Sequence, residues 1–158
     1  MATFEELFIR VGGSIDSEAR ALAEDLGMTL AEDSDGRIYL SRAATDGDGK
    51  VGGEVYRNRF TDTEIDDEPQ AFDGYETVFA IWTTVRSLAK QGSEARQIFR
   101  ELALKHPDTA MVLTHDLDLI TAAYLPGRGT HEFPDGTTVD VDDEPVWRPW
   151  VTGRPNTA

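Results

Sequence analysis

Apolar residues recur at helical spacing in two stretches of the chain. In the first stretch they stand at positions i, i+4, i+7, i+8 and i+11, which are Ile15, Ala19, Leu22, Ala23 and Leu26. Ser14 precedes this stretch and Gly27 follows it, and these residue types favour the two ends of a helix. The second stretch has alternating steps of three and four residues through Val85, Leu88, Gly92, Ala95, Phe99 and Leu102. We predict one helix over 15–26 and another that ends before His106-Pro107, with Gly92 as a candidate break in it.

Runs rich in β-branched and aromatic residues predict strands around both helices. In the first half we predict strands over 6–11, 28–33, 37–42 and 51–60. A turn at Ser34-Asp35-Gly36 joins the second of these strands to the third, and Gly52-Gly53 is a candidate bulge in the fourth. In the second half we predict strands over 75–82, 109–114 and 117–125, followed by a hairpin that turns at Pro134-Asp135-Gly136. Each half therefore has the order β-α-β-β-β.

This order of elements predicts an α+β fold, in which a mostly antiparallel sheet carries two helices on one face. Two alternatives stay open: an ordinary α+β domain, and a tandem β-α-β-β-β repeat, for which Ser17-Glu18-Ala19-Arg20 recurs as Ser93-Glu94-Ala95-Arg96. We expect a single domain over 1–145, with candidate halves 1–61 and 75–145 joined by an acidic loop at 62–74.

The segment 146–158 is expected to be a C-terminal tail rich in tryptophan and proline. Proline at 145 and 149 argues against both a helix and a central strand here. We expect Trp147 and Trp150 to pack back onto the domain as a final anchor. The alternative is an exposed aromatic patch, because tryptophan is enriched at the hot spots of protein interfaces.

Charge is the strongest functional signal in the sequence. The 158 residues contain 15 Lys and Arg against 30 Asp and Glu, which gives a net charge of −15. Two windows contain acids and no Lys or Arg: 60–85 with seven acids and 129–147 with six. Such a field repels phosphate backbones and anionic lipids, and it attracts cationic partners. We therefore expect neither nucleic acid nor membrane as a partner; the competing interpretation of the charge is solubility alone.

The composition also limits the kinds of site and of protein that the sequence can represent. Cysteine is absent, which excludes disulfides, thiolate metal sites and cysteine nucleophiles. No apolar run approaches the roughly 20 residues that span a bilayer, so we expect a cytoplasmic protein. Twelve Arg against three Lys, in a composition rich in Ala, Asp and Gly, suggests a bacterial source with a GC-rich genome.

Candidate catalytic and metal motifs are incomplete. Residues 44–51 alternate Asp and Gly like the centre of a calcium loop, but Ala44 and Val55 stand where that loop needs its first and last ligands. The pairs His115/Asp118 and His131/Glu132 have side chains that suit transition metals, without helical i, i+4 spacing. Nucleophile-elbow, phosphate-loop and zinc-protease motifs are absent from the sequence. We predict no catalytic residue, no metal and no cofactor.

The β-α-β-β-β order over residues 4–143, with Asp25-Leu26-Gly27-Met28 after the first helix, resembles the vicinal-oxygen-chelate superfamily. That resemblance implies a small-molecule binding or resistance protein, or a metalloenzyme whose ligands are His and Glu on strands. The strands predicted to open the two halves, 6–11 and 75–82, contain no histidine.

We predict that the protein is not an enzyme but an acidic inhibitor, such as a bacterial toxin–immunity protein or antitoxin, that occludes a basic toxin or enzyme. The predicted contacts are the acids of the two windows: Asp62, Glu64, Asp66, Asp67 and Glu68, together with Asp140, Asp142, Asp143 and Glu144. The vicinal-oxygen-chelate-like binder or metalloenzyme is the alternative, and a scaffold that uses the Trp147/Trp150 tail is a third possibility. The sequence leaves the oligomeric state open.

Overall fold

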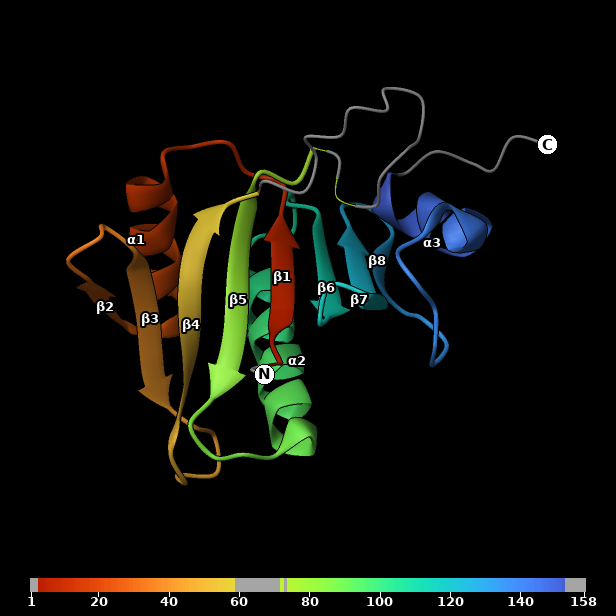
Figure 1. The fold of residues 1–158 in the computed structure, drawn as a ribbon. Helices are drawn as coiled ribbons and strands as arrows, with labels where there is room; N and C mark the ends of the chain where they lie inside the picture. Colours follow the sequence, from red (N-terminus) through yellow and green to blue (C-terminus); the bar gives the residue numbers. More distant parts are fainter. Residues whose placement is uncertain (1–2, 59–71, 73, 153–158) are drawn as a thin grey trace.

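Eight strands form one sheet in the computed structural model, which describes residues 3–58, 72 and 74–152 (Figure 1). The strand order is β2-β3-β4-β5-β1-β6-β7-β8, and each neighbouring pair is antiparallel. The elements in chain order are β1 (Glu5–Ile9), α1 (Ile15–Leu26), β2 (Thr29–Glu32), β3 (Ile38–Ala43), β4 (Lys50–Arg57), β5 (Thr77–Thr83), α2 (Leu88–Lys105), β6 (Met111–His115), β7 (Leu119–Leu125), β8 (Gly129–Glu132), the short 3-10 helix η1 (Val141–Asp143) and α3 (Glu144–Val151). The predicted α+β class is confirmed.

The two halves have the same order of elements but different places in the sheet. The first half runs β1-α1-β2-β3-β4 and the second runs β5-α2-β6-β7-β8. In the first half the last strand, β4, lies next to the central pair β5-β1, and β2 lies at the edge. In the second half the first strand after the helix, β6, lies next to that pair, and β8 lies at the edge. A duplicated module would place equivalent strands at equivalent positions in the sheet, and these two halves do not.

Both predicted helices form; α2 begins at Leu88, three residues after the predicted start, and is continuous. The Ser14 hydroxyl accepts a hydrogen bond from the backbone N–H of Ser17, and Gly27 ends α1 at a φ of 63°. In α2 the predicted break at Gly92 is wrong, because the helix runs from Leu88 to Lys105. A glycine in a helix costs about 1 kcal/mol of stability. This cost is small beside the free energy gained by burying the apolar side chains that follow Gly92 in α2.

Helices α1 and α2 cover one face of the sheet and enclose the larger hydrophobic core. Leu22 and Leu26 of α1 and Phe99 and Leu102 of α2 pack against alternate residues of the strands, such as Leu7 of β1. Figure 1 shows both helices behind the sheet. The two helices on one face confirm the predicted layer order.

A second core lies on the opposite face, and α3 covers only part of that face. Trp147 is fully buried, and its Nε1 donates to the Asp140 carbonyl at 3.0 Å. It packs in a cluster with Phe8 of β1 and Ile120 of β7. The predicted anchoring by Trp147 is confirmed, whereas the argument against a helix is wrong. Pro145 stands in the first turn of α3, where no intrahelical donor is needed, and Pro149 lies two residues before its end.

The predicted bulge at Gly52-Gly53 is also wrong. Strand β4 pairs in continuous register with both β3 and β5 across these two positions. The glycines are needed for close approach instead. A Cβ atom at Gly52 would lie 2.0 Å from the Leu40 carbonyl oxygen, and one at Gly53 would lie 1.6 Å from the Ala80 carbonyl oxygen.

Candidate functional site

A wide groove lies on the sheet face opposite α1 and α2. The near face of β3, β4, β5 and β1 in Figure 1 carries no helix among the described residues. The groove has a volume of about 950 Å³, and its lining includes Glu6, Tyr39, Glu54, Tyr56, Trp82 and Leu117. Most of the lining residues come from four adjacent strands; the β2–β3 turn, the β6–β7 turn, Phe4 before β1 and Ile15 at the start of α1 supply the rest. This groove is the candidate site.

Strand pairing places the polar residues of the groove in one row across the sheet. Tyr39 pairs with Glu54, Glu54 with Ala80, and Ala80 with Glu6. Paired residues of neighbouring strands point to the same face, and strands lie about 4.8 Å apart, so Glu54 and Glu6 are about 10 Å apart across the sheet. The methyl group of Ala80 between them leaves the space that the groove occupies.

Glu6 is the most unusual residue of this row. It is only 3% exposed, although it carries a carboxyl group. Its Oε1 accepts hydrogen bonds from the Thr114 hydroxyl and from the backbone N–H of Leu117, both at 2.9 Å. Burial raises the pKa of Glu6 from 4.5 to about 7, and the nearby carboxylates of Glu5 and Asp116 act in the same direction. Near neutral pH the groove therefore holds a carboxyl group that can gain or lose a proton.

The backbone that donates to Glu6 is held in a strained conformation. Asp116 and Leu117 form the turn between β6 and β7, with φ angles of 54° and 59°. Left-handed backbone suits glycine or asparagine and costs a residue such as leucine about 1–2 kcal/mol. This conformation presents the Leu117 N–H to Oε1 of Glu6.

Aromatic and basic side chains complete the lining. Tyr39, Tyr56 and Trp82 are each half-buried and combine apolar rings with polar atoms. Arg37 and Arg57, two exposed residues, also line the groove. Arg57 donates to the Gly13 carbonyl at 3.1 Å and pairs with Glu76 at 3.5 Å. The surface thus has aromatic patches beside both acidic and basic groups.

The acids predicted as partner contacts have different fates. Asp62, Glu64, Asp66, Asp67 and Glu68 lie outside the described residues. Of the second group, Asp140 and Asp142 are exposed.

The other two members of the second group have partners within the chain, one in the connection between β8 and α3 and one inside α3. Asp143 Oδ2 accepts from the backbone N–H and the hydroxyl of Thr138, at 2.7 and 2.8 Å, and these bonds lower the pKa of Asp143. Glu144 pairs with Arg148 at 2.6 Å, one helical turn along α3. Asp143 and Glu144 therefore have structural partners within the chain.

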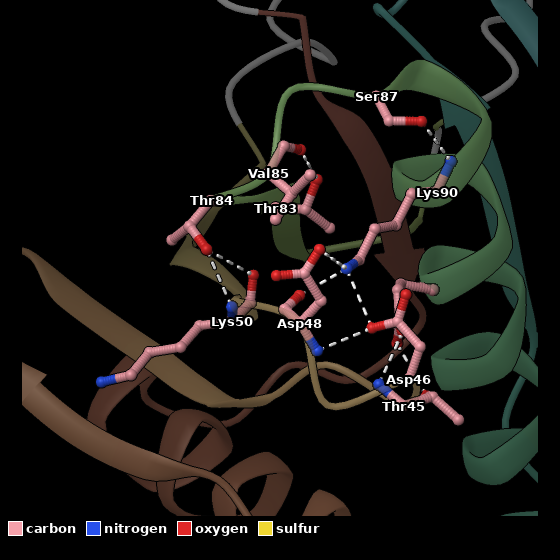
Figure 2. A network of polar contacts seen from close by, with 10 residues as sticks. Thr45, Asp46, Asp48, Lys50, Thr83, Thr84, Val85, Ser87 and Lys90 are labelled. Atoms are coloured by element: carbon pink, nitrogen blue, oxygen red, sulfur yellow. Dashed lines mark hydrogen bonds and ion pairs between the residues drawn. The ribbon is translucent and has the colours of Figure 1, made fainter.

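The loop that resembles a calcium site holds an ammonium group instead (Figure 2). The Nζ atom of Lys90, from the first turn of α2, lies 2.9 Å from Oδ1 of Asp46 and 3.9 Å from Oδ2 of Asp48. The same Nζ donates to the Asp48 carbonyl. Glu94, one turn further along α2, accepts from the backbone N–H and the hydroxyl of Thr45. The alternating acids thus fix the β3–β4 loop to α2.

The histidines do not converge on a metal site. His115 Nδ1 lies 2.7 Å from Glu5 Oε1, on the sheet face that α2 covers, whereas the neighbouring Glu6 faces the groove. His131 stacks on Trp150 with 4.2 Å between ring centroids, and Arg128 lies over the same indole. Within residues 3–58, 72 and 74–152 no three His, Asp or Glu side chains form a group that could hold a metal ion. The His and Glu ligand set implied by the vicinal-oxygen-chelate resemblance does not fit these positions.

Sequence reasoning did not single out Glu6. Glu6 is the first residue of the strand predicted over 6–11. Because residues two apart in a strand point to the same face, Glu6 shares a face with the apolar Phe8, which is fully buried. An acid on the face of an apolar strand residue was the signal that could have identified it. In the part of the chain that the structure describes, no helix combines the length and apolar composition needed to cross a bilayer. Comparisons with protein-family models, curated proteins and solved structures gave no match.

Proposed function

We propose that the protein is an acidic inhibitor, of the kind that bacterial immunity proteins represent, that binds a basic toxin or enzyme through the groove face of its sheet. The observation that carries this proposal is the open row of Tyr39, Glu54, Ala80 and Glu6, flanked by the half-buried ring of Trp82. A net charge of −15 supports it, because the field steers a cationic protein toward this molecule.

The chemistry of the groove suits a protein partner with protruding basic side chains. Tyrosine and tryptophan are enriched where interfaces gain most of their energy, and their rings also attract cations. Glu54 and Glu6 give two acceptors for such side chains, on strand positions whose backbones are about 10 Å apart. The acids of 62–68 and 140–144 stay predicted contacts of the partner.

A small cationic ligand is the second candidate, because a volume of about 950 Å³ lies within the range of about 300–1,000 Å³ usual for ligand pockets. This candidate keeps the small-molecule binding of the vicinal-oxygen-chelate-like alternative and requires no metal.

The test begins with capture of partners from lysate of the source organism at low and moderate salt, with identification of the retained proteins by mass spectrometry. A purified candidate is then titrated with the protein, and both its activity and its dissociation constant are measured. We expect a basic protein whose activity falls on binding and whose association slows as salt rises.

Three variants locate the surface. Trp82→Ala and Glu54→Lys change the groove, and Asp142→Lys is a matched charge change on an exposed acid of the second window. We expect the groove variants to weaken binding at least tenfold and Asp142→Lys to reduce mainly the association rate. Unchanged binding by both groove variants would refute the assignment of this face.

A further inference from the structure

We propose that Glu6 receives the ammonium group of one lysine side chain of the partner, which enters the groove over Ala80. This inference rests on the proposed function and names the side chain that the groove selects. It makes Glu6 a specificity-determining residue of the binding surface.

One carboxylate oxygen of Glu6 is left for an external donor. Oε1 already has two donors, Thr114 and Leu117. Oε2 accepts no hydrogen bond from the residues that the structure describes, and it is not among their fully buried unpaired atoms, so it reaches the surface of the groove although Glu6 is only 3% exposed. A carboxylate oxygen that faces a groove and has no donor from the protein can accept a hydrogen bond from a ligand, and such bonds to a charged group are among the strong ones. The vacant acceptor points to a ligand with an N–H group.

The shape of the site favours lysine over arginine. A guanidinium group binds carboxylates best through two parallel hydrogen bonds, which need both oxygens of the carboxylate. Glu6 offers one oxygen, because the other is engaged by the β6–β7 turn. An ammonium group is a compact point charge on a thin aliphatic stem, so it can reach a group that is 3% exposed. The stem would pass between Ala80 and the ring of Trp82, which both line the groove.

The charges around Glu6 also call for a cation from outside the chain. On β1, Glu5 is its neighbour and faces α2, where it is bonded to Gln91 and His115. Asp116 lies in the turn after β6, and Glu54 lies across the groove on β4. Strand β5 contributes Ala80 and Trp82, and β6 contributes Thr114, none of which is charged. Within the described ranges Glu6 has no ion pair with Lys, Arg or His.

Lysine binding is linked to loss of a proton from Glu6. With a pKa of about 7, the carboxyl group is mostly protonated at pH 6 and mostly ionised at pH 8. The ammonium group binds the ionised form, so the apparent affinity follows the ionised fraction and rises about tenfold from pH 6 to pH 8. At pH 6 the protonated carboxyl group keeps the groove in its weak-binding form.

The direct test uses n-butylammonium chloride, which carries the end of a lysine side chain, as the probe. The titration of the Glu6 carboxyl carbon is followed by NMR in the full-length protein, with and without the probe. Tetramethylammonium chloride at equal concentration controls for ionic strength, and n-butylguanidinium chloride represents arginine. We expect n-butylammonium to lower the Glu6 titration midpoint by a pH unit or more, and n-butylguanidinium to lower it less. An unchanged midpoint, or a larger effect of the guanidinium probe, would overturn the proposal.

Variants separate this inference from the proposed function. Glu6→Gln keeps the shape of the side chain and removes its charge, and Glu54→Gln is the matched control on the other groove acid. With the identified partner, we expect Glu6→Gln to weaken binding and abolish the tenfold rise between pH 6 and pH 8, and Glu54→Gln to retain that rise. If Trp82→Ala weakens binding while Glu6→Gln changes neither affinity nor its pH dependence, the inference is wrong and the proposed function stands. If none of the groove variants changes binding, both fail.

Discussion

Replacing Glu6 by Gln should stabilise the protein at alkaline pH. In the folded protein burial raises the pKa of Glu6 from 4.5 to about 7. Between these pH values the folded state holds a proton that the unfolded state has lost, so stability falls as pH rises through this window. The difference between the two pKa values corresponds to a loss of about 3 kcal/mol of unfolding free energy above pH 7. Glutamine remains neutral, and its amide oxygen can still accept from Thr114 and Leu117.

The magnitude follows from the same linkage at each pH. At pH 4.5 the Glu6 carboxyl group is protonated in the folded protein, and the variant should differ from the parent by less than about 1 kcal/mol. At pH 8 it should be more stable by about 3 kcal/mol, because only the parent pays for a buried negative charge. The expected signature is therefore a gain in stability that appears between pH 4.5 and pH 8.

Urea denaturation of both proteins at several pH values, followed by circular dichroism, measures this difference. Glu54→Gln is the matched control, because Glu54 is half-buried on the same groove. The comparison between parent and variant cancels the other acids, which titrate in both proteins. A free-energy difference that stays constant from pH 4.5 to pH 8 would refute the reasoning about Glu6, even if the variant were more stable throughout.

Three other changes test the fold and its polar contacts. Trp147→Ala should lower the unfolding free energy by about 3–5 kcal/mol in urea denaturation, because the indole is fully buried between α3 and the sheet; a loss below 1 kcal/mol would contradict this packing. Gly27→Ala should destabilise the fold by about 1 kcal/mol, because its φ is 63°, whereas Gly92→Ala, a matched change within α2, should stabilise it by a similar amount. Thermal unfolding measures both; a stabilising Gly27→Ala or a destabilising Gly92→Ala would contradict the corresponding assignment. Lys90→Met should raise the pKa of Asp46, which the ammonium group now lowers, and carboxyl NMR would show no change if the pair in Figure 2 does not form in solution.

Local patterns in the sequence predicted the helices well, because their determinants are close together in the chain. Ser14 and Gly27 mark the ends of α1 in the structure as they do in the sequence. The break expected at Gly92 was wrong because a propensity of about 1 kcal/mol is outweighed by burial of the apolar side chains that follow the glycine in α2. The same holds for α3, where burial of Trp147 and a favourable place for Pro145 outweigh the usual effect of proline.

The sheet order and the groove could not be predicted in the same way, because they depend on contacts between distant residues. The identical order of elements in the two halves suggested a repeat, yet β4 and β6 flank the central pair rather than β4 and β8. The row of groove residues joins positions 6, 39, 54 and 80, and only the pairing register brings them together. The acids are densest in 60–85 and 129–147, whereas the buried acid at the centre of the candidate site, Glu6, stands within β1 beside Glu5.

A contrast between two carboxylate sites of the described chain supports the proposed external partner for Glu6. At the β3–β4 loop, Asp46 and Asp48 receive the ammonium group of Lys90 from the same chain, and the contact fixes the loop to α2. At β1, Glu6 is buried without a cation in the described part of the chain, between a strained turn and an open groove. A neutral residue of similar shape would avoid the cost, so stability alone does not account for an acid here. A lysine supplied by the partner would do for Glu6 what Lys90 does for Asp46, and it would do so only when the complex forms.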